Sequence, residues 1–301
     1  MPTLLGQNQY GKAENRVVRI TRDGGTHHIK DLNVSVALSG DMHDVHLSGS
    51  NANVLPTDTT KNTVFAFAKE HGIDSAEAFG IRLARHFVTS QQPIHRARIR
   101  IEEHAWERIP AAGLDRGEHS FVRKGQETRT TEVAYDGEQW QVISGLTGLV
   151  VLNSTDSEFW GFVKDGYTTL QETRDRILAT EVNARWRFGW TGAAGQDVPP
   201  WEESYAAVRG DLLGAFAETY SLSLQQSLFA MGSRVIDNSA AVAAVDEVRL
   251  SLPNKHHFLA DLAPFGLTND NEVYLAADRP YGLIEGTVLR DGAEARIPVT
   301  D

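Results

Sequence analysis

The chain has 301 residues, of which 41% are apolar and 23% charged, values typical of a globular protein with one large domain or two smaller ones. Its 29 Lys and Arg residues against 40 Asp and Glu residues give a net charge of −11, which would repel a nucleic acid. The lack of cysteine excludes disulfides, thiolate nucleophiles and cysteine-bound metals. No window approaches eighteen consecutive apolar residues, so no segment is expected to span a membrane. Because of the charge and of this absence, neither nucleic acid nor a membrane is an expected partner.

Neither end of the chain carries a recognisable targeting signal. Residues 1–11 lack the basic segment and apolar run of a secretory signal, and residues 298–301 do not form a Ser-Lys-Leu peroxisomal address. We therefore expect a cytoplasmic protein.

The first half of the chain begins with the pattern of a β-hairpin. Apolar and polar residues alternate over 16–22 and again over 32–38, with the turn sequence Asp23-Gly24-Gly25 between them. Alternation with period two on both sides of such a turn predicts two antiparallel strands.

An amphipathic helix is predicted next. Asp74, with Glu77 three residues later, is typical of a helix start. Phe79, Leu83 and Phe87 follow at four-residue spacing and would form one apolar stripe along the helix.

Strands return after this helix. Apolar residues alternate with arginines over 96–101, which predicts a strand, and a polar strand is predicted from about residue 119 to residue 135. The tight turn Asp136-Gly137 follows, and there the pattern restarts.

The second half repeats this order of elements. It contains two strands, a loop rich in Gly and Pro, a helical region with two apolar stripes, and two final strands. The predicted bounds are 140–152 and 177–188 for the first strands, 189–200 for the loop, 205–236 for the helical region, and 248–262 and 272–289 for the last strands.

Each half, 1–136 and 137–301, is therefore predicted to run strand–strand–helix–helix–strand–strand. This is an α+β arrangement in which two helices lie on one face of an antiparallel four-stranded sheet. The other face of each sheet would remain exposed and apolar. Closure of sheets from several subunits into a barrel would bury it.

Three polar segments are candidate functional sites. Lys12 precedes the first strand, where a lysine is most often a solvated cation. Residues 56–63 are dense in hydroxyl groups, which is typical of a helix N-cap, although free N–H groups at a helix start can also bind an anion. Pro253, Asn254 and His256 interrupt an apolar strand, which favours either a functional site or a structural, hydrogen-bonded histidine.

Metal and nucleotide sites are not supported. The adjacent histidines at 27–28 and 256–257 lie on predicted strands, where neighbouring side chains point to opposite faces. His43 and His46 lack further clustered ligands. There is no Gly-x-Gly-x-x-Gly fingerprint and no P-loop, so we expect no metal and no organic cofactor.

Together these segments resemble the urate oxidase (uricase) family over nearly the whole chain. Any one motif is a weak signal, but seven in the right order, with the internal duplication of the family, are a strong one. The resembling stretches are Tyr10-Gly11-Lys12, Thr57-Asp58 with Lys61-Asn62-Thr63, residues 157–162, residues 167–170 with 175–178, Leu224-Gln225, residues 252–256 and residues 278–284.

The resemblance implies the tunnelling fold, a duplicated unit of sheet and two helices that assembles into a homotetramer enclosing a barrel tunnel. It implies a cofactor-independent oxidation of urate by molecular oxygen and water to 5-hydroxyisourate and hydrogen peroxide. We also expect active sites shared between subunits, with Lys12 and Thr57 in the first repeat of one chain. Phe159, Arg176, Gln225 and His256 would come from its neighbour.

Residue by residue, the resemblance gives three side chains a direct contact with the purine. Phe159 matches the ring that stacks on it. Arg176 matches the planar guanidinium that grips urate in a bidentate way. Gln225 matches the amide that pairs with the pyrimidine edge, because an amide offers donor and acceptor together.

Four further positions complete the match to the substrate site. Leu224, Thr57 and Asp58 would offer backbone N–H groups, and Asn254 matches the residue that holds oxygen, and later water, above the ring.

Lys12, Thr57 and His256 match the proton relay of the family. A lysine acts as a base only if burial lowers its pKa, and a neighbouring hydroxyl could then pass the proton.

Three other functions compete with this interpretation. A pterin-processing relative of the same fold would need a cluster of metal ligands. A non-catalytic purine-binding protein could keep Phe159 and Arg176 but would not need the relay. A purely structural barrel leaves the polar insertion at 253–256 unexplained.

Overall fold

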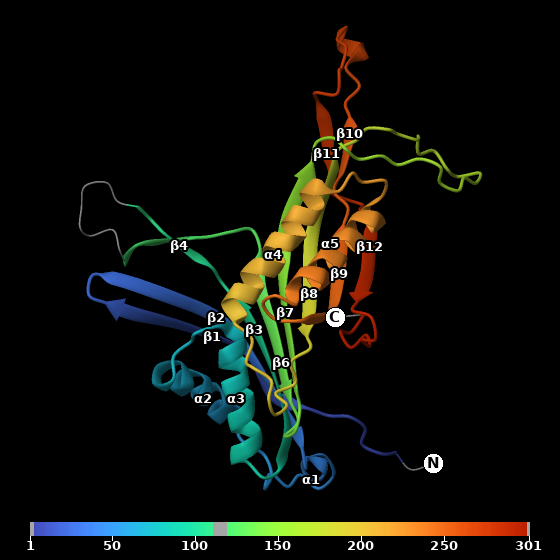
Figure 1. Cartoon of the computed structure of the whole chain (residues 1–301). Coiled ribbons are helices and arrows are strands. Elements are labelled where there is room, and N and C mark those ends of the chain that lie inside the picture. The colour runs from blue at the N-terminus through green and yellow to red at the C-terminus, as the bar shows by residue number, and fades with distance from the viewer. Residues whose placement is uncertain (1–2, 111–118, 300–301) are drawn as a thin grey trace. The chain divides into compact units, whose positions relative to one another are not determined.

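The computed structural model describes residues 3–110 and 119–299 and shows an α+β protein with antiparallel strand pairs (Figure 1). The chain divides into two compact units. The first comprises Met1–Gly145 with Arg187–Glu202, and the second comprises Leu146–Trp186 with Glu203–Asp301. Met1 and Pro2, and Thr300 and Asp301, which belong to the terminal segments searched for targeting signals, lie outside the described residues.

The first unit contains a strand pair, three helices and further strands. Within it the strands follow the order β1-β2-β3-β6. The bounds are β1 (Tyr10–Asp23), β2 (Thr26–Gly40), α1 (His43–Leu47), α2 (Thr57–Glu70), α3 (Ala76–Ser90), β3 (Ile94–Glu103), β4 (Trp106–Arg108), β5 (Phe121–Arg123) and β6 (Thr128–Tyr135).

The predicted hairpin is confirmed. β1 and β2 pair in antiparallel register around the turn between Asp23 and Thr26, and the alternating Val34, Val36 and Leu38 are buried. The single strand predicted from 119 to 135 is wrong. The chain there forms β5, which pairs with β4, and then β6, which pairs with β3.

Both predicted helices of this unit are present, but the capping residue predicted for each of them was wrong. α3 is capped by Ser75, whose Oγ accepts from Ala78 N at 3.0 Å, and not by Asp74. α2 begins at Thr57, and its N-cap residue, Pro56, makes no side-chain cap hydrogen bond. Proline cannot supply a capping oxygen from its side chain, so a hydroxyl cap at this helix was a wrong prediction.

α3 packs against β3 and β6, whereas α2 packs against β1. The apolar stripe Phe79, Leu83 and Phe87 of α3 is fully buried. The core of this unit therefore lies between these helices and one face of the strands, as the amphipathic pattern predicts.

A buried charge network crosses this core. The Glu77 side chain is 0% exposed, and its Oε2 accepts from Arg129 Nη2 at 2.7 Å. Its Oε1 accepts from the hydroxyls of Thr131 and Ser144. Burial alone lowers the pKa of Arg129, but the nearby carboxylates of Glu77, Glu103 and Glu202 raise it above its ordinary value.

The second unit is built in the same order, with the strand sequence β7-β8-β9-β12. β7 and β8 also contribute residues to the first unit. The bounds are β7 (Trp140–Asn153), β8 (Leu178–Phe188), α4 (Trp201–Glu218), α5 (Leu224–Ser239), β9 (Val245–Pro253), β10 (His256–Leu259), the 3-10 helix η2 (Ala263–Phe265), β11 (Tyr274–Ala277) and β12 (Leu283–Leu289).

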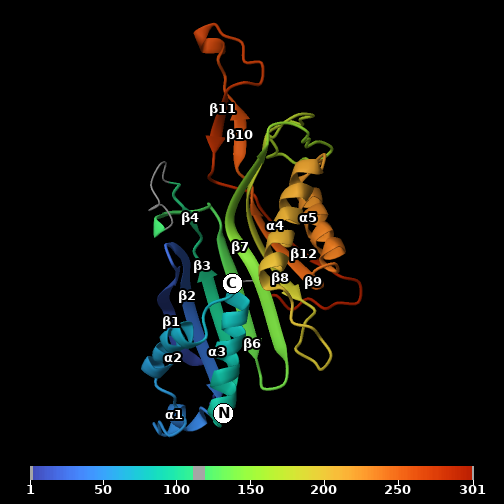
Figure 2. The ribbon, with the colours of Figure 1, turned by 60° about the vertical axis from the view of Figure 1, so that its left-hand side comes forward.

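Figures 1 and 2 show α4 and α5 side by side across one face of these strands, and α5 packs against β9 and β12. The loop predicted at 189–200 is confirmed. The helical region predicted over 205–236 is two helices separated by residues 219–223.

The last two predicted strands are each interrupted. β9 ends at Pro253, and β10 begins at His256 and pairs only with β11, so the hairpin β10–β11 separates from β9 and β12 (Figure 2). Proline donates no hydrogen bond to a ladder, which explains why the strand ends there. Within the described residues no helix is long and apolar enough to cross a membrane.

Candidate active site

A cavity of about 800 Å³ opens in the second unit. Its walls come from the loop before β8, the start of α5, and the segment after β9. The residues predicted for substrate binding or catalysis that line it are Phe159, Arg176, Leu224, Gln225, Asn254 and His256.

Arg176 and Phe159 border the same space. The Arg176 Cζ lies 5.1 Å from the centroid of the Phe159 ring, and the Phe162 ring stacks on Phe159 with centroids 5.0 Å apart. Ser157 holds the arginine, since its hydroxyl accepts from Arg176 Nε at 3.2 Å and its carbonyl accepts from Arg176 N at 3.0 Å. Burial lowers the pKa of Arg176, but a guanidinium remains protonated at neutral pH.

A backbone β-bridge and a buried hydroxyl–hydroxyl bond connect Ser157 to α5. Ser157 and Ser221 form a parallel β-bridge, and Ser221 N donates to Asp156 O at 2.9 Å. Ser227, on the first turn of α5, donates from its hydroxyl to the Ser221 Oγ at 2.8 Å. Because Ser157 and Ser221 are almost completely buried, the arginine loop and the helix have a fixed relation to one another.

The start of α5 presents Leu224 and Gln225 to the cavity. Ser223 is the N-cap, and its hydroxyl accepts from Gln226 N at 3.2 Å. Neither Leu224 N nor Gln225 N has a hydrogen-bond partner among the residues that the structure describes. Free N–H groups at a helix start favour an anionic or carbonyl-bearing ligand.

Asn254 and His256 lie where the chain leaves β9. Asn254 N donates to Gly282 O at 2.8 Å, and Lys255 N donates to Ala179 O at 2.8 Å. The fully buried Thr180 donates from its hydroxyl to Pro253 O at 2.9 Å. These bonds fix the short segment that presents Asn254 and His256 to the cavity.

The His256 ring is half-buried and stacks on Phe258, with centroids 5.8 Å apart. Burial lowers the pKa of His256 below that of a free imidazole, and the positive charge of Arg176 lowers it further. The ring therefore stays neutral to lower pH than an exposed histidine does, which suits a group that accepts a proton at neutral pH.

Because the charge of Arg176 contributes to the lowered pKa of His256, removing that charge should change the pKa. In Arg176→Gln we expect the pKa of His256 to rise toward its ordinary value, as measured by NMR titration of the imidazole C–H. Arg174→Gln is the matched control, because Arg174 lies on the same loop but stacks over Trp160 at 3.6 Å. A His256 titration that is the same in Arg176→Gln and the unmodified protein would contradict this account.

The other predicted residues, Lys12, Thr57 and Asp58, belong to the first unit. Lys12 lies on β1 opposite Val36, directly before a β-bulge. Asn15 stabilises the bulge by donating to Lys12 O at 3.1 Å and Val34 O at 2.8 Å. Bulges of this kind redirect a side chain and are frequent beside active sites.

Thr57 and Asp58 form the first turn of α2. The Asp58 carboxylate accepts from Lys61 and Asn62, and its pKa is lowered, first by Lys61 and, more weakly, by the Lys12 ammonium. Within the described part of the chain the N–H groups of Thr57 and Asp58 have no partner. They remain available to a ligand, as the resemblance requires.

Several residues of this site were missed by sequence reasoning. Ser157 and Thr180 hold the predicted groups, and Phe258 and Tyr274 line the cavity wall. A polar Thr180 in the buried start of β8 was a usable signal, whereas the aromatic residues of β10 and β11 looked like ordinary strand residues.

Potential metal ligands are dispersed. Across residues 3–110 and 119–299, no three His, Asp or Glu side chains come together in a group that could hold an ion.

Comparison with known proteins gives consistent matches over the whole chain. A family model described as Uricase matches residues 8–134 and 142–285. The chain is 48% identical to the uricase of Arthrobacter globiformis, over 98% of this chain and 93% of that protein. It is 35% identical to the uricase of Aspergillus flavus, over 96% of this chain and 98% of that protein.

Solved structures agree with these matches. The crystal structure of the Arthrobacter globiformis uricase superposes with a TM-score of 0.90 and covers 99% of both chains. The urate oxidase of Bacillus sp. TB-90 is 22% identical, with a TM-score of 0.78 over 94% of this chain and all of that chain. At that identity the likeness shows the fold alone.

Proposed function

Because this chain belongs to the uricase family and is a urate oxidase of purine catabolism, we propose that the residues around the cavity of the second unit bind urate. Lys12, Thr57 and Asp58 complete the site. The observation that carries this proposal is the convergence of Arg176, Phe159 and the α5 start on one space.

Urate is a flat anion, and each wall of the cavity suits one part of it. Its plane stacks on the face of Phe159 that Phe162 leaves open. The Arg176 guanidinium binds an oxygen and a ring nitrogen on one edge, and Gln225 with the Leu224 N–H pairs with the pyrimidine edge. In a chain of net charge −11, this local cation is what makes binding of an anion favourable.

The chemistry needs deprotonation, orientation and shielding from solvent. Lys12 and Thr57 take a proton from urate, and His256, kept neutral by burial, tunes this relay. The electron-rich urate gives two electrons to oxygen, which leaves as hydrogen peroxide after taking up two protons. Water then supplies the hydroxyl of 5-hydroxyisourate. Asn254 holds first oxygen and then water above the ring.

The complete site is proposed to be composite. Each half of the chain, 1–136 and 137–301, is one tunnelling-fold repeat. The repeats of several chains close into a barrel in a homotetramer, so that Lys12 and Thr57 of one subunit face the cavity of its neighbour. The lining of the cavity supports this proposal. Its described lining residues all come from the second unit, so Lys12 and Thr57, which lie in the first unit, are not among them. The cytoplasmic location expected from the sequence is part of the same proposal.

Urate consumption in metal-free buffer tests this function. Protein dialysed against a strong chelator is expected to consume urate and release an equal amount of hydrogen peroxide, at the rate of undialysed protein. Metal and flavin contents are measured in the same samples. Activity that follows residual metal would contradict a cofactor-free reaction, and urate binding without turnover would favour a non-catalytic purine-binding protein.

Replacing the planar guanidinium of Arg176 should weaken substrate binding. In Arg176→Lys the bidentate contact and the bond to Ser157 are lost, which is expected to cost about 1.5–3 kcal/mol, or roughly 10–150-fold in affinity. KM and inhibitor dissociation constants measure this. Arg174→Lys, on the same loop, should change neither, and unchanged affinity in Arg176→Lys would remove that arginine from the site.

A further inference from the structure

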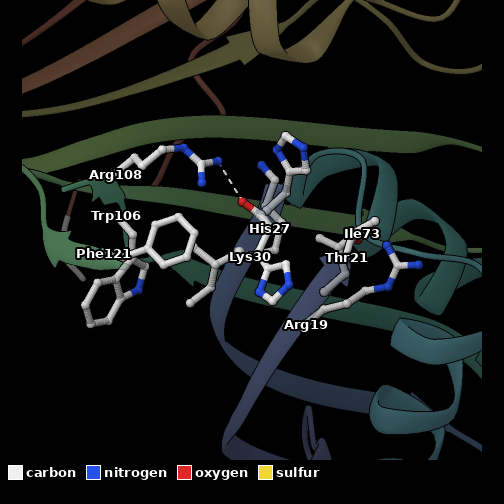
Figure 3. A pocket seen from close by; sticks show the side chains of 10 residues that line it. Arg19, Thr21, His27, Lys30, Ile73, Trp106, Arg108 and Phe121 are labelled. Atoms are coloured by element: carbon white, nitrogen blue, oxygen red, sulfur yellow. Dashed lines mark hydrogen bonds between the residues drawn. The ribbon is translucent and has the colours of Figure 1, made fainter. Parts of the chain in front are cut away.

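A second cavity, of about 440 Å³, lies entirely in the first unit, and we call it the basic cavity (Figure 3). It shares no residue with the candidate active site. It is formed by the β1–β2 hairpin, the turn between α2 and α3, and the β4–β5 pair. Its lining residues are Arg19, Thr21, His27, His28, Ile29, Lys30, Ile73, Trp106, Arg108 and Phe121.

The hairpin places two cations directly opposite each other in this cavity. Arg19 on β1 pairs in register with Lys30 on β2, and Thr21 pairs with His28 two residues further along. Residues at these spacings share one face of a hairpin. Like charges directly opposite each other destabilise a strand pair unless a counter-charge lies between or beside them.

Among the described residues, only one of the two cations has such a counter-charge. Lys30 Nζ lies 2.7 Å from Glu103 Oε1 and 3.5 Å from Glu202 Oε1. Arg19 forms no ion pair with any residue in the described ranges. Arg19 is a half-buried residue, and its guanidinium lies beside Gly72, where an added Cβ would be 3.0 Å from Arg19 Nη1.

The opposite wall supplies a third, fixed cation. Arg108 donates from Nη2 to His27 O at 2.7 Å, and its Cζ lies 5.2 Å from the centroid of the Phe121 ring. Figure 3 shows Arg108 and Phe121 on one side of His27 and Arg19 on the other. No carboxylate is among the described residues that line the basic cavity, in a chain with eleven more acidic than basic residues.

We propose that the basic cavity is a binding site for a phosphate-bearing anion. Two guanidinium groups and a lysine supply positive charge and N–H donors, the two histidine rings can add further hydrogen bonds, and arginine forks match phosphate oxygens in bidentate geometry. The volume lies within the usual range of small-molecule sites. Bound phosphate supplies the counter-charge that Arg19 lacks and relieves its repulsion from Lys30.

Calorimetry and phosphorus NMR with pyrophosphate test this on the full-length protein. Arg19→Gln and Arg108→Gln are each expected to weaken pyrophosphate binding by about tenfold or more. Arg22→Gln is the matched control, because it removes the same charge from β1 three residues beyond Arg19 and does not line the cavity. It should change affinity less than about twofold. Retained urate oxidation shows that each variant is folded.

Two further experiments identify the ligand and show that it does not bind in the candidate active site. Inorganic phosphate and ADP are compared with pyrophosphate, and adenosine serves as the uncharged control. Tighter binding of ADP indicates a nucleotide that also contacts the Phe121 or Trp106 ring, whereas equal binding indicates free phosphates. Saturating urate under nitrogen should leave pyrophosphate bound. The proposal is overturned by absence of binding, by equal loss in Arg22→Gln, or by displacement with urate.

Discussion

Thr57→Ala and Arg176→Ala are each expected to be inactive alone and to regain urate oxidation when they are unfolded and refolded together. Thr57 lies in the first unit and Arg176 in the second. If each pocket combines the first repeat of one chain with the second repeat of another, each variant alone spoils every pocket. In a random mixture about one quarter of the pockets collect two unmodified halves.

The measurement is the initial rate of urate loss in mixed oligomers of the correct size, compared with each variant refolded alone. A matched control pairs Arg176→Ala with Phe159→Ala. Both residues lie in the second unit, so that every pocket carries one lesion and no activity should return. Each variant alone is expected to oxidise urate at a rate reduced by about a thousandfold. If the mixture of Thr57→Ala and Arg176→Ala assembles correctly and its rate stays that low, all of these residues act within one chain.

Glu77→Ala is expected to lower the free energy of unfolding by about 3–5 kcal/mol, because it leaves one buried cation and two buried hydroxyls without their acceptor. Arg129 is 8% exposed, so water cannot fully replace the lost carboxylate. The remaining partners of Arg129, Glu103 and Glu202, reduce the loss without abolishing it.

Urea denaturation followed by circular dichroism measures this loss. Glu70→Ala on α2 is the control, because the Glu70 side chain is 64% exposed and its carboxylate lies as far as 3.9 Å from the ring of its neighbour His71. Surface pairs of this kind contribute little. An unfolding midpoint of Glu77→Ala equal to that of the control would show that the buried network is not a source of stability.

Local patterns predicted the elements of this fold better than their ends. The hairpin of β1 and β2 and the stripe on α3 followed from spacing alone, because one buried face imposes a period on the sequence. The capping residue of α3 could not be separated from its neighbour, since Asp74 and Ser75 are both good caps. The role of Glu77 depends on Arg129, 52 residues away, which no local pattern reveals.

The residues of the candidate site were likewise predictable only in part. The polar insertion around His256 was visible because it breaks an apolar strand, and the family resemblance supplied Arg176 and Phe159. Ser157 and Thr180 could not be predicted as their anchors, because their hydrogen bonds join segments that meet only in the folded chain. The lowered pKa of His256 likewise depends first on burial in the folded chain and then on the charge of Arg176, 80 residues away in sequence.

The connection from Ser157 through Ser221 to Ser227, a backbone β-bridge followed by a hydroxyl–hydroxyl bond, also limits how this protein can change in length during evolution. Each residue of an α-helix is rotated by about 100° from the one before it. One residue inserted between Ser223 and Leu224 would turn Gln225 away from the cavity and Ser227 away from Ser221 together. Insertions and deletions among relatives should therefore be absent from this turn and collect in exposed loops such as 189–200.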